Sequence, residues 1–490
     1  MFFNSLAFLI FFPVVTALYF VLPHRFRWSL LLLASCIFYM AFVPWYVFIL
    51  FAIIIIDYVA GILIEKSSGE RRKLWLGLSI TANIGLLAVF KYYNFASTNI
   101  NALAQAVDWN YSLPLLKIIL PLGLSFHTFQ AMSYTIEVYR ARQKAERHLG
   151  IYALYVLFYP QLVAGPIERP GELLPQLHAA HSFDPDRVSR GLARMLGGFF
   201  KKIVIADRSA LLVNAVYNHP ESFGGFSYIV ATIFFAFQIY GDFAGYSDIA
   251  IGAAEVMGYR LRENFNRPYF ARSIADFWRR WHMSLSSWFR DYVYIPLGGS
   301  RVRPFRHYAN LVIVFLLSGL WHGAGWTFVV WGALHGLAIS LGDATSNLRS
   351  RLHTLLRLQL FSRLHILFQV ACTFVLVCVT WIFFRSPTMG QAVRMIKSIG
   401  ALFFSAPQTA MSGWSLSHNL FLDQGSTRFI VTVSAILGLI GAEYLSRRSG
   451  LRDFFSRQKF TLRLAAYSFL LWFIIIFGQF GHHQFIYFTF

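Results

Sequence analysis

The sequence predicts an all-α protein that crosses a membrane many times. Of its 490 residues, 57% are hydrophobic and only 13% are charged, whereas a soluble globular protein carries about 25% charged residues. Several apolar runs exceed the roughly 18 residues that signal a membrane-spanning helix. We therefore expect a polytopic integral membrane protein with no soluble domain longer than a loop.

We expect about eleven or twelve membrane-spanning helices along the chain. The first covers residues 3–22, and because Arg25 and Arg27 follow it, the positive-inside rule places the N-terminus outside. Residues 151–164 are short for a span and indicate a re-entrant segment. Later spans are expected at 28–43, 45–64, 74–90, 113–136, 366–384, 392–404, 429–445 and 462–480. Residues 226–240 and 242–257 form an apolar pair broken at 241–245, residues 310–320 and 326–334 are two further apolar segments, and an amphipathic or partly buried helix is expected within 185–217. The last span leaves the C-terminal residues 481–490 outside.

The charge balance favours a membrane surface over a nucleic acid as the partner. Lys and Arg number 43 against 22 Asp and Glu, a formal charge of +21. In a membrane protein such an excess reflects the basic cytoplasmic loops and their attraction to anionic lipid, and it also suits an acidic, phosphorylated cosubstrate. The three cysteines lie in apolar runs, and no nucleotide-binding or metal-binding motif is present, so we expect no disulfide, metal or bound cofactor.

Residues 259–310 form a basic segment, expected on the cytoplasmic side. It holds ten Lys or Arg and three Asp or Glu. Within it, Arg279 and Arg280 stand beside Trp281 and His282, and Arg290 follows. Such a pattern is typical of an interfacial helix with lipid-facing arginines. By itself the pattern favours this interpretation over a surface that binds an anionic cosubstrate.

His322 lies between two uncharged apolar segments, residues 310–320 and 326–334. An ionisable group inside a membrane is a functional candidate by default, although a packing histidine is about equally compatible with the sequence. Gly319, Gly323 and Gly325 flank it and suggest a thinned backbone that a ligand can approach. Other polar residues within apolar segments predict a lined tunnel: His127, Gln161, Gln238, Asp242, Ser247, Asp248, His282 and His335. Two histidines at different depths suit acyl transfer, because imidazole can take up and return a hydroxyl proton.

Several motifs together resemble the membrane-bound O-acyltransferase (MBOAT) family. They are FKYYNF (90–95), LVAGPIERP (162–170), YGDFAGYSDIAIG (240–252), ENFNRPY (263–269), SIADFWRRWHMSLSSWFRDYVYIPLGG (273–299) and SGLWHGAGWTFVVWGALHG (318–336). The similarity is greatest to the bacterial branch that includes alginate O-acetyltransferase and the membrane subunits of peptidoglycan O-acetylation and teichoic acid D-alanylation.

The resemblance implies a single transmembrane domain whose helices ring a funnel, with His322 as the catalytic histidine and His282 as its second histidine. It implies acetyl-CoA as donor, for which Arg279, Arg280 and Arg290, with Trp281, are the expected binding residues. Gln238, Asp242, Ser247, Asp248 and Trp321 are the expected tunnel lining.

The C-terminal FIYFTF (485–490) also has a counterpart in that branch. The resemblance implies that Tyr487 relays the acyl group to an extracytoplasmic serine esterase-like (SGNH-type) partner. An aromatic interface anchor is the simpler alternative.

The sequence thus predicts an inner-membrane O-acetyltransferase that acts on an exported polysaccharide. A D-alanyl transferase supplied by a carrier protein and a polysaccharide transporter or flippase are the alternatives. A transporter commonly shows paired halves, and no internal repeat is found.

Overall fold

The structure is a computed structural model that describes residues 1–117, 120–355, 362–404, 415–445, 458–481 and 485–486. These residues form helices joined by loops and turns, with no β-strand among them. The chain divides into two compact units. Unit 1 comprises Met1–Met195 and Tyr246–Glu263, and unit 2 comprises Leu196–Gly245 and Asn264–Phe490.

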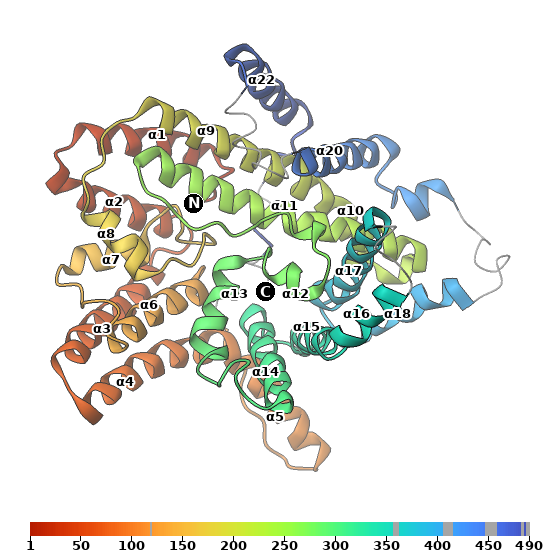
Figure 1. The fold of residues 1–490 in the computed structure, drawn as a ribbon, viewed down its shortest axis with the longest axis horizontal. Coiled ribbons are helices and arrows are strands. Elements are labelled where there is room, and N and C mark those ends of the chain that lie inside the picture. Colours follow the sequence, from red (N-terminus) through yellow and green to blue (C-terminus); the bar gives the residue numbers. More distant parts are fainter. Residues whose placement is uncertain (118–119, 356–361, 405–414, 446–457, 482–484, 487–490) are drawn as a thin grey trace. The chain divides into compact units, whose positions relative to one another are not determined.

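The helices of unit 1 pack against one another, both between neighbours in the sequence and between helices farther apart along the chain (Figure 1). Helix α3 packs against α4 and α6, and α2 packs against α7. The helices are α1 (Leu6–Val21), α2 (His24–Met40), α3 (Tyr46–Lys66), α4 (Gly69–Leu87), η1 (Ala88–Tyr92), α5 (Tyr93–Ala106), α6 (Leu124–Tyr139), α7 (Leu149–Leu157), α8 (Pro170–His178) and most of α9 (Pro185–Phe199).

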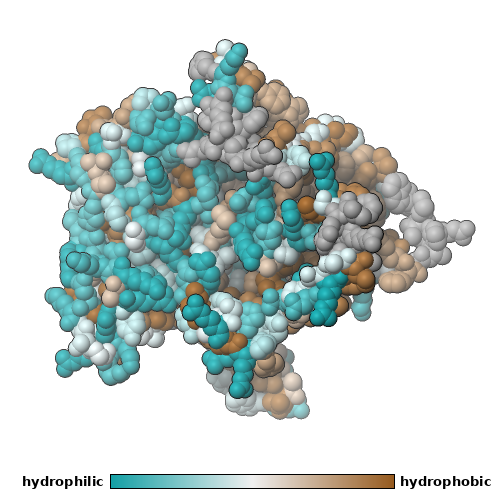
Figure 2. All heavy atoms as spheres, viewed as in Figure 1, coloured by the Kyte–Doolittle hydropathy of each residue, from teal (hydrophilic) through white to brown (hydrophobic). Residues whose placement is uncertain are grey.

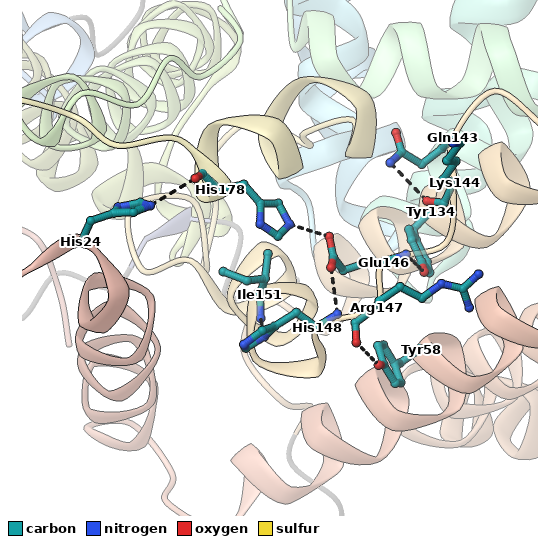
Figure 3. A network of polar contacts seen from close by, with 10 residues as sticks. All are labelled: His24, Tyr58, Tyr134, Gln143, Lys144, Glu146, Arg147, His148, Ile151 and His178. Atoms are coloured by element: carbon teal, nitrogen blue, oxygen red, sulfur yellow. Dashed lines mark hydrogen bonds and ion pairs between the residues drawn. The ribbon is translucent and has the colours of Figure 1, made fainter.

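A network of polar contacts ties the basic loop after α6 to its neighbours in unit 1 (Figure 3). Glu146 accepts the backbone N–H of His148 at 2.8 Å and contacts Nε2 of His178 at 2.8 Å. Its own backbone N–H donates to the Tyr134 hydroxyl at 2.9 Å. The ring of His148 in turn caps α7 by accepting the N–H of Ile151 at 3.1 Å. Figure 2 shows a hydrophilic face over these helices of unit 1, as expected for a surface outside the hydrocarbon layer.

The GPIERP motif (165–170) is also part of unit 1 and binds the chain at Arg262, near the last residue of that unit. Glu168 is fully buried, and its Oε1 accepts the backbone N–H of Arg262 at 2.7 Å. The Arg262 guanidinium binds both carboxylate oxygens of Glu172, at 2.6 and 2.5 Å. Burial raises the pKa of Glu168 to about 8, whereas the bidentate contact with Arg262 lowers the pKa of Glu172.

Unit 2 contains the remaining helices. They are η2 (Phe200–Ala206), α10 (Asp207–Tyr217), η3 (Pro220–Ser222), α11 (Gly225–Met257, which ends in unit 1), η4 (Pro268–Phe270), α12 (Ile274–Trp278), α13 (Met283–Phe289), η5 (Arg290–Tyr294), α14 (Pro304–His322), α15 (Trp326–Ala344), α16 (Ser346–Leu355), α17 (Ser362–Arg385), α18 (Met389–Phe404), η7 (Leu416–Leu420), α20 (Ser426–Leu445) and α22 (Phe460–Phe477). Helices α14 and α15 lie side by side as a hairpin (Figure 1).

Within the described residues, six helices are long and apolar enough to cross a membrane, and two shorter apolar helices accompany them. The multi-pass, all-helical architecture is therefore confirmed. The six are fewer than the eleven or twelve expected, because several apolar runs fold into helices of fewer than 18 residues. Among these runs are α1 with 16 residues, α2 with 17 and α6 with 16.

Two expected boundaries are wrong. The stretch 113–136 does not form one span, because α6 begins only at Leu124. The break expected at 241–245 is absent, because α11 runs unbroken for 33 residues. Its glycines serve close packing instead: a Cβ on Gly241 would lie 2.8 Å from the carbonyl oxygen of Lys201, and one on Gly245 would lie 2.7 Å from that of Gly198. The backbone of η2 and of the last turn of α9 can approach α11 this closely because these glycines have no side chain.

Candidate active site

The hairpin of α14 and α15 positions His322, which is the last residue of α14 and is buried. Gly323 follows it, and a Cβ there would lie 2.1 Å from the ring of Phe328 on α15. A Cβ on Gly319 would lie 2.3 Å from the backbone oxygen of the same phenylalanine. These two glycines therefore let the two helices pack together. The expectation that they leave room for a ligand is wrong for both, since Phe328 fills that space.

His282 occupies a strained turn between α12 and α13. It is fully buried, and its backbone has φ +43° and ψ +55°, a left-handed conformation that few non-glycine residues adopt and that clusters at functional sites. Asn264 holds the turn: its carbonyl accepts the N–H of Met283 at 3.0 Å and its Oδ1 accepts the hydroxyl of Ser284 at 2.7 Å. The N–H of Asn266 donates to the carbonyl of Arg280 at 2.9 Å. The ENFNRPY motif is thus the clamp that fixes the backbone of His282.

Both histidines contact one tryptophan. The ring centroid of Trp321 lies 5.9 Å from that of His282 and 4.8 Å from that of His322. His322 also contacts Trp331 at 5.1 Å and Phe384 at 5.4 Å. Burial lowers the pKa of His282 to about 3, so its imidazole is neutral at pH 7. The structure therefore brings together, in an apolar and aromatic setting, the two imidazoles that the sequence singled out.

A third histidine, His335 on α15, has both ring nitrogens engaged. The indole N–H of Trp278 donates to Nδ1 at 3.2 Å, so Nδ1 is unprotonated. Nε2 lies 3.0 Å from the hydroxyl of Thr380, and that hydroxyl donates its own proton to the Val377 carbonyl at 2.8 Å. Nε2 must therefore carry the proton and donate it to Thr380. These bonds define a neutral tautomer whose hydrogen-bonding capacity is fully used.

Asp242, expected in the tunnel lining, belongs to a buried ion cluster at the junction of η2, α10 and α11. Lys202 Nζ lies 2.7 Å from Oδ1 of Asp207 and 2.7 Å from Oδ1 of Asp242. All three side chains are at least 93% buried. Burial raises the pKa of Asp207 to about 7 against the opposing effect of Lys202. Oδ2 of Asp242 accepts the backbone N–H of Ile486 at 2.6 Å, so the C-terminal segment reaches this cluster.

The expected donor-binding arginines lie on or beside α12 and η5. Arg279 and Arg290 are exposed, and Arg290 pairs with Asp291 at 2.8 Å. Arg280 is half-buried and pairs with Asp276 at 2.9 Å. Trp281 differs from them, because it is 1% exposed and packs among other aromatic rings, including Phe277 and Trp381.

The remaining expected residues are distributed differently. Gln238 is half-buried on the unit 2 part of α11. Ser247 and Asp248 belong to unit 1, where Asp248 pairs with Arg194 at 2.8 Å. Tyr487 lies outside the described residues. Lys202, Asp207 and Asn264 did not stand out in the sequence as site residues. The GDFAG stretch pointed to Asp242 but not to the ion cluster with Lys202 and Asp207. The ENFNRPY motif contains Asn264 but did not show that Asn264 bonds the turn at His282.

Residues 73–386 match the family model described as MBOAT, membrane-bound O-acyltransferase family. The chain belongs to this family. It is similar to the probable alginate O-acetylase of Azotobacter vinelandii, with 35% identity over 90% of this chain and 85% of that protein. The peptidoglycan O-acetyltransferase of Helicobacter pylori is 36% identical over 76% of this chain and 73% of that protein. A teichoic acid D-alanyltransferase of Bacillus subtilis is 29% identical over 45% of this chain and 58% of that protein.

The protein is therefore a multi-pass membrane acyltransferase, and the resemblance inferred from its motifs is confirmed. Membership in an enzyme family also argues against the transporter alternative. His282, Trp321 and His322 all fall within the matched region.

Proposed function

We propose that this MBOAT protein is an O-acetyltransferase that passes the acetyl group of acetyl-CoA to an exported polysaccharide. The relatives named for O-acetylation of alginate and of peptidoglycan support this acyl group and this class of acceptor. The observation that carries the proposal is the pair of buried imidazoles, His282 and His322, in contact with the ring of Trp321. We place the protein in the inner membrane with both termini outside.

In the proposed reaction, a ring nitrogen of His322 accepts the proton of an attacking hydroxyl group. The hydroxyl oxygen forms an ester bond with the thioester carbonyl carbon while the C–S bond breaks. The departing thiolate then takes the proton back from the imidazolium, so that the imidazole ends the cycle neutral. Asp242, Gln238, Ser247 and Asp248 are assigned to the polar path through the protein, and His282 to its donor side.

We assign the CoA phosphates to Arg279, Arg280 and Arg290. The exposure of Arg279 and Arg290 supports this assignment, because an anionic cosubstrate needs accessible cations. Trp281 is buried among aromatic rings, which supports a packing contribution to the site in place of direct contact with the donor. Charge reversal at Arg279 or Arg290 should raise the KM for acetyl-CoA roughly tenfold. Arg301→Glu, at another exposed arginine of the basic segment, is the matched control, and equal KM values in all three variants would contradict the assignment.

We assign Tyr487 as the acyl relay. Its hydroxyl is the group activated by His322, and the acetyl-tyrosine then delivers the acetyl group to a serine esterase-like (SGNH-type) partner outside the membrane. The burial of the two residues that precede it, Phe485 and Ile486, supports this, because they lie inside unit 2.

Labelled acetyl-CoA and the purified full-length protein test the reaction. His322→Gln should reduce acetyl transfer at least a hundredfold, because general acid–base catalysis contributes about 10²–10⁴ in rate. His307→Gln, on the same helix, is the control and should change the rate less than twofold. Wild-type rates in His322→Gln would refute the mechanism. Label absent from the C-terminal peptide, together with full activity in Tyr487→Phe, would refute the relay.

A D-alanyl transferase supplied by a carrier protein is the second candidate, and the similarity to teichoic acid D-alanyltransferases favours it. Depletion of the carrier protein distinguishes the two. Loss of function on depletion, with acetyl-CoA without effect, would decide for D-alanylation.

A further inference from the structure

The C-terminal segment of unit 2 follows η2 after α22 ends. The guanidinium of Arg208 donates to the carbonyl of Phe477 at 2.9 Å. The backbone N–H of Gln479 donates to the carbonyl of Ile203 at 3.1 Å. Gly478 between them lies against the same isoleucine, because a Cβ there would be 2.8 Å from its Cγ2. Three successive residues of the segment are thus in contact with η2 or the start of α10.

The segment is again fixed at Phe485 and Ile486, which are 2% and 7% exposed. The Phe485 ring packs edge-on against Phe243, with centroids 5.7 Å apart. The backbone N–H of Ile486 donates to Oδ2 of Asp242 at 2.6 Å. Both partners belong to the GDFAG stretch of α11, whose glycines bring η2 close to the same helix.

The charges of the ion cluster suit this contact. Lys202 carries one positive charge and faces two carboxylates, Asp207 and Asp242. A buried carboxylate is strongly destabilising unless a cation and hydrogen-bond donors compensate it. Lys202 supplies the cation at Oδ1 of Asp242, and the Ile486 N–H supplies a donor at Oδ2. Such a charge-assisted hydrogen bond is stronger than a neutral one.

We propose that Asp242, held by Lys202, is the docking site for the C-terminal segment. By binding the segment at Ile486, it determines the position of the residues that follow. Phe243 extends this docking site toward the catalytic pair, since its ring also lies 4.5 Å from that of His282. Asp242 and Lys202 are thus positioning residues. Their effect on acetyl transfer rests on the relay that we propose above, whereas the docking itself does not.

The first test compares Ile486→Pro with Ile486→Ala in the full-length protein without substrate. Both variants lose the isoleucine side chain, but only proline removes the N–H that Asp242 accepts. Hydrogen exchange of the C-terminal peptide, measured by mass spectrometry, reports whether the segment stays docked. The remaining amides should exchange roughly tenfold or more faster in Ile486→Pro than in Ile486→Ala, since a hydrogen bond to a charged group contributes about 1.5–3 kcal/mol.

The second test compares Asp242→Asn with Asp207→Asn. Each variant removes one carboxylate charge that faces Lys202, but among the described residues of the C-terminal segment the hydrogen bond from Ile486 goes to Asp242 and not to Asp207. Exchange of the C-terminal peptide should accelerate in Asp242→Asn and remain at the wild-type rate in Asp207→Asn. Adding Ile486→Pro to Asp242→Asn should then produce less than its full effect, because the two residues share one contact.

These outcomes separate the docking site from the relay. Equal exchange in Ile486→Pro and Ile486→Ala, or equal acceleration in the two aspartate variants, overturns the docking proposal whatever the acetylation assay shows. Faster exchange in Ile486→Pro and Asp242→Asn alone, with full transfer by Tyr487→Phe, supports docking and refutes only the relay.

Discussion

The hydrogen bonds of His335 give a sharp prediction for Thr380→Val. Valine has nearly the shape of threonine but lacks the hydroxyl that accepts the Nε2–H of His335. Because His335 is fully buried, the N–H would then lack its acceptor, which costs about 1–3 kcal/mol of stability. We expect the thermal midpoint of the purified protein to fall by several degrees.

Activity should fall as well, although no residue in this contact touches the reacting atoms. His335 packs against Trp331 with ring centroids 4.9 Å apart, and Trp331 packs against His322 at 5.1 Å. If about 1 kcal/mol of the loss appears as misplacement of His322, kcat falls roughly fivefold. Initial rates with labelled acetyl-CoA at saturating donor measure this change, and KM for the donor should remain within twofold.

Two variants of α17 make this reasoning refutable. Thr380→Ser keeps the hydroxyl and should restore both the midpoint and kcat. Thr373→Val makes the same chemical change on the same helix, but the Thr373 hydroxyl donates to the Gln369 carbonyl of α17 itself, at 2.7 Å. Equal losses of kcat in Thr373→Val and Thr380→Val would show that His335 does not position the site.

Two further predictions concern packing and pH. Gly319→Ala should destabilise the protein by about 1–3 kcal/mol, because its Cβ would lie 2.3 Å from a backbone oxygen of Phe328. The thermal midpoint of the purified protein measures this loss. Gly342→Ala is the control and should leave the midpoint unchanged, because nothing lies within 4 Å of the added Cβ. Burial raises the pKa of Glu168 in the folded state from 4.5 to about 8. Between these two pH values the folded state holds a proton on Glu168 that the unfolded state has lost. The free energy of unfolding should therefore fall as pH rises from 4.5 to 8, by at most about 1.4 kcal/mol per pH unit. In Glu168→Gln the thermal midpoint should lose this slope, and a wild-type slope in that variant would contradict it.

The fold class was predictable because it rests on bulk properties. Long apolar runs and few charges require helices that satisfy their own backbone hydrogen bonds in lipid. Every regular element among the described residues is a helix. The boundaries were less predictable, since local signals depend on tertiary context. The glycines of GDFAG are typical of a helix break, yet they lie within α11 because η2 packs against them.

The candidate site was predictable only in part. His322 stood out because an ionisable residue interrupts an uncharged stretch, and His282 stood out as a second histidine, within the basic segment; the motif resemblance then implied their roles. The bonds that fix these residues join distant positions: Asn264 holds the turn at His282, and Lys202 reaches Asp242 from 40 residues away in the sequence. Neither pair has a spacing that a helix or turn rule recognises, so only the tertiary structure could reveal them.

Three histidines are buried in the described part of unit 2, and they differ in what they can do with a proton. Nδ1 of His335 accepts the indole N–H of Trp278, and its Nε2–H donates to Thr380. Protonation of Nδ1 would place a second N–H directly against the indole N–H, which is repulsive. A ring held this way resists any change of protonation, which suits a positioning residue and not a general base. The ring of His322 lies against the rings of Trp321, Trp331 and Phe384. His335 is therefore a positioning residue, which keeps the Trp331 ring in place beside the ring of His322.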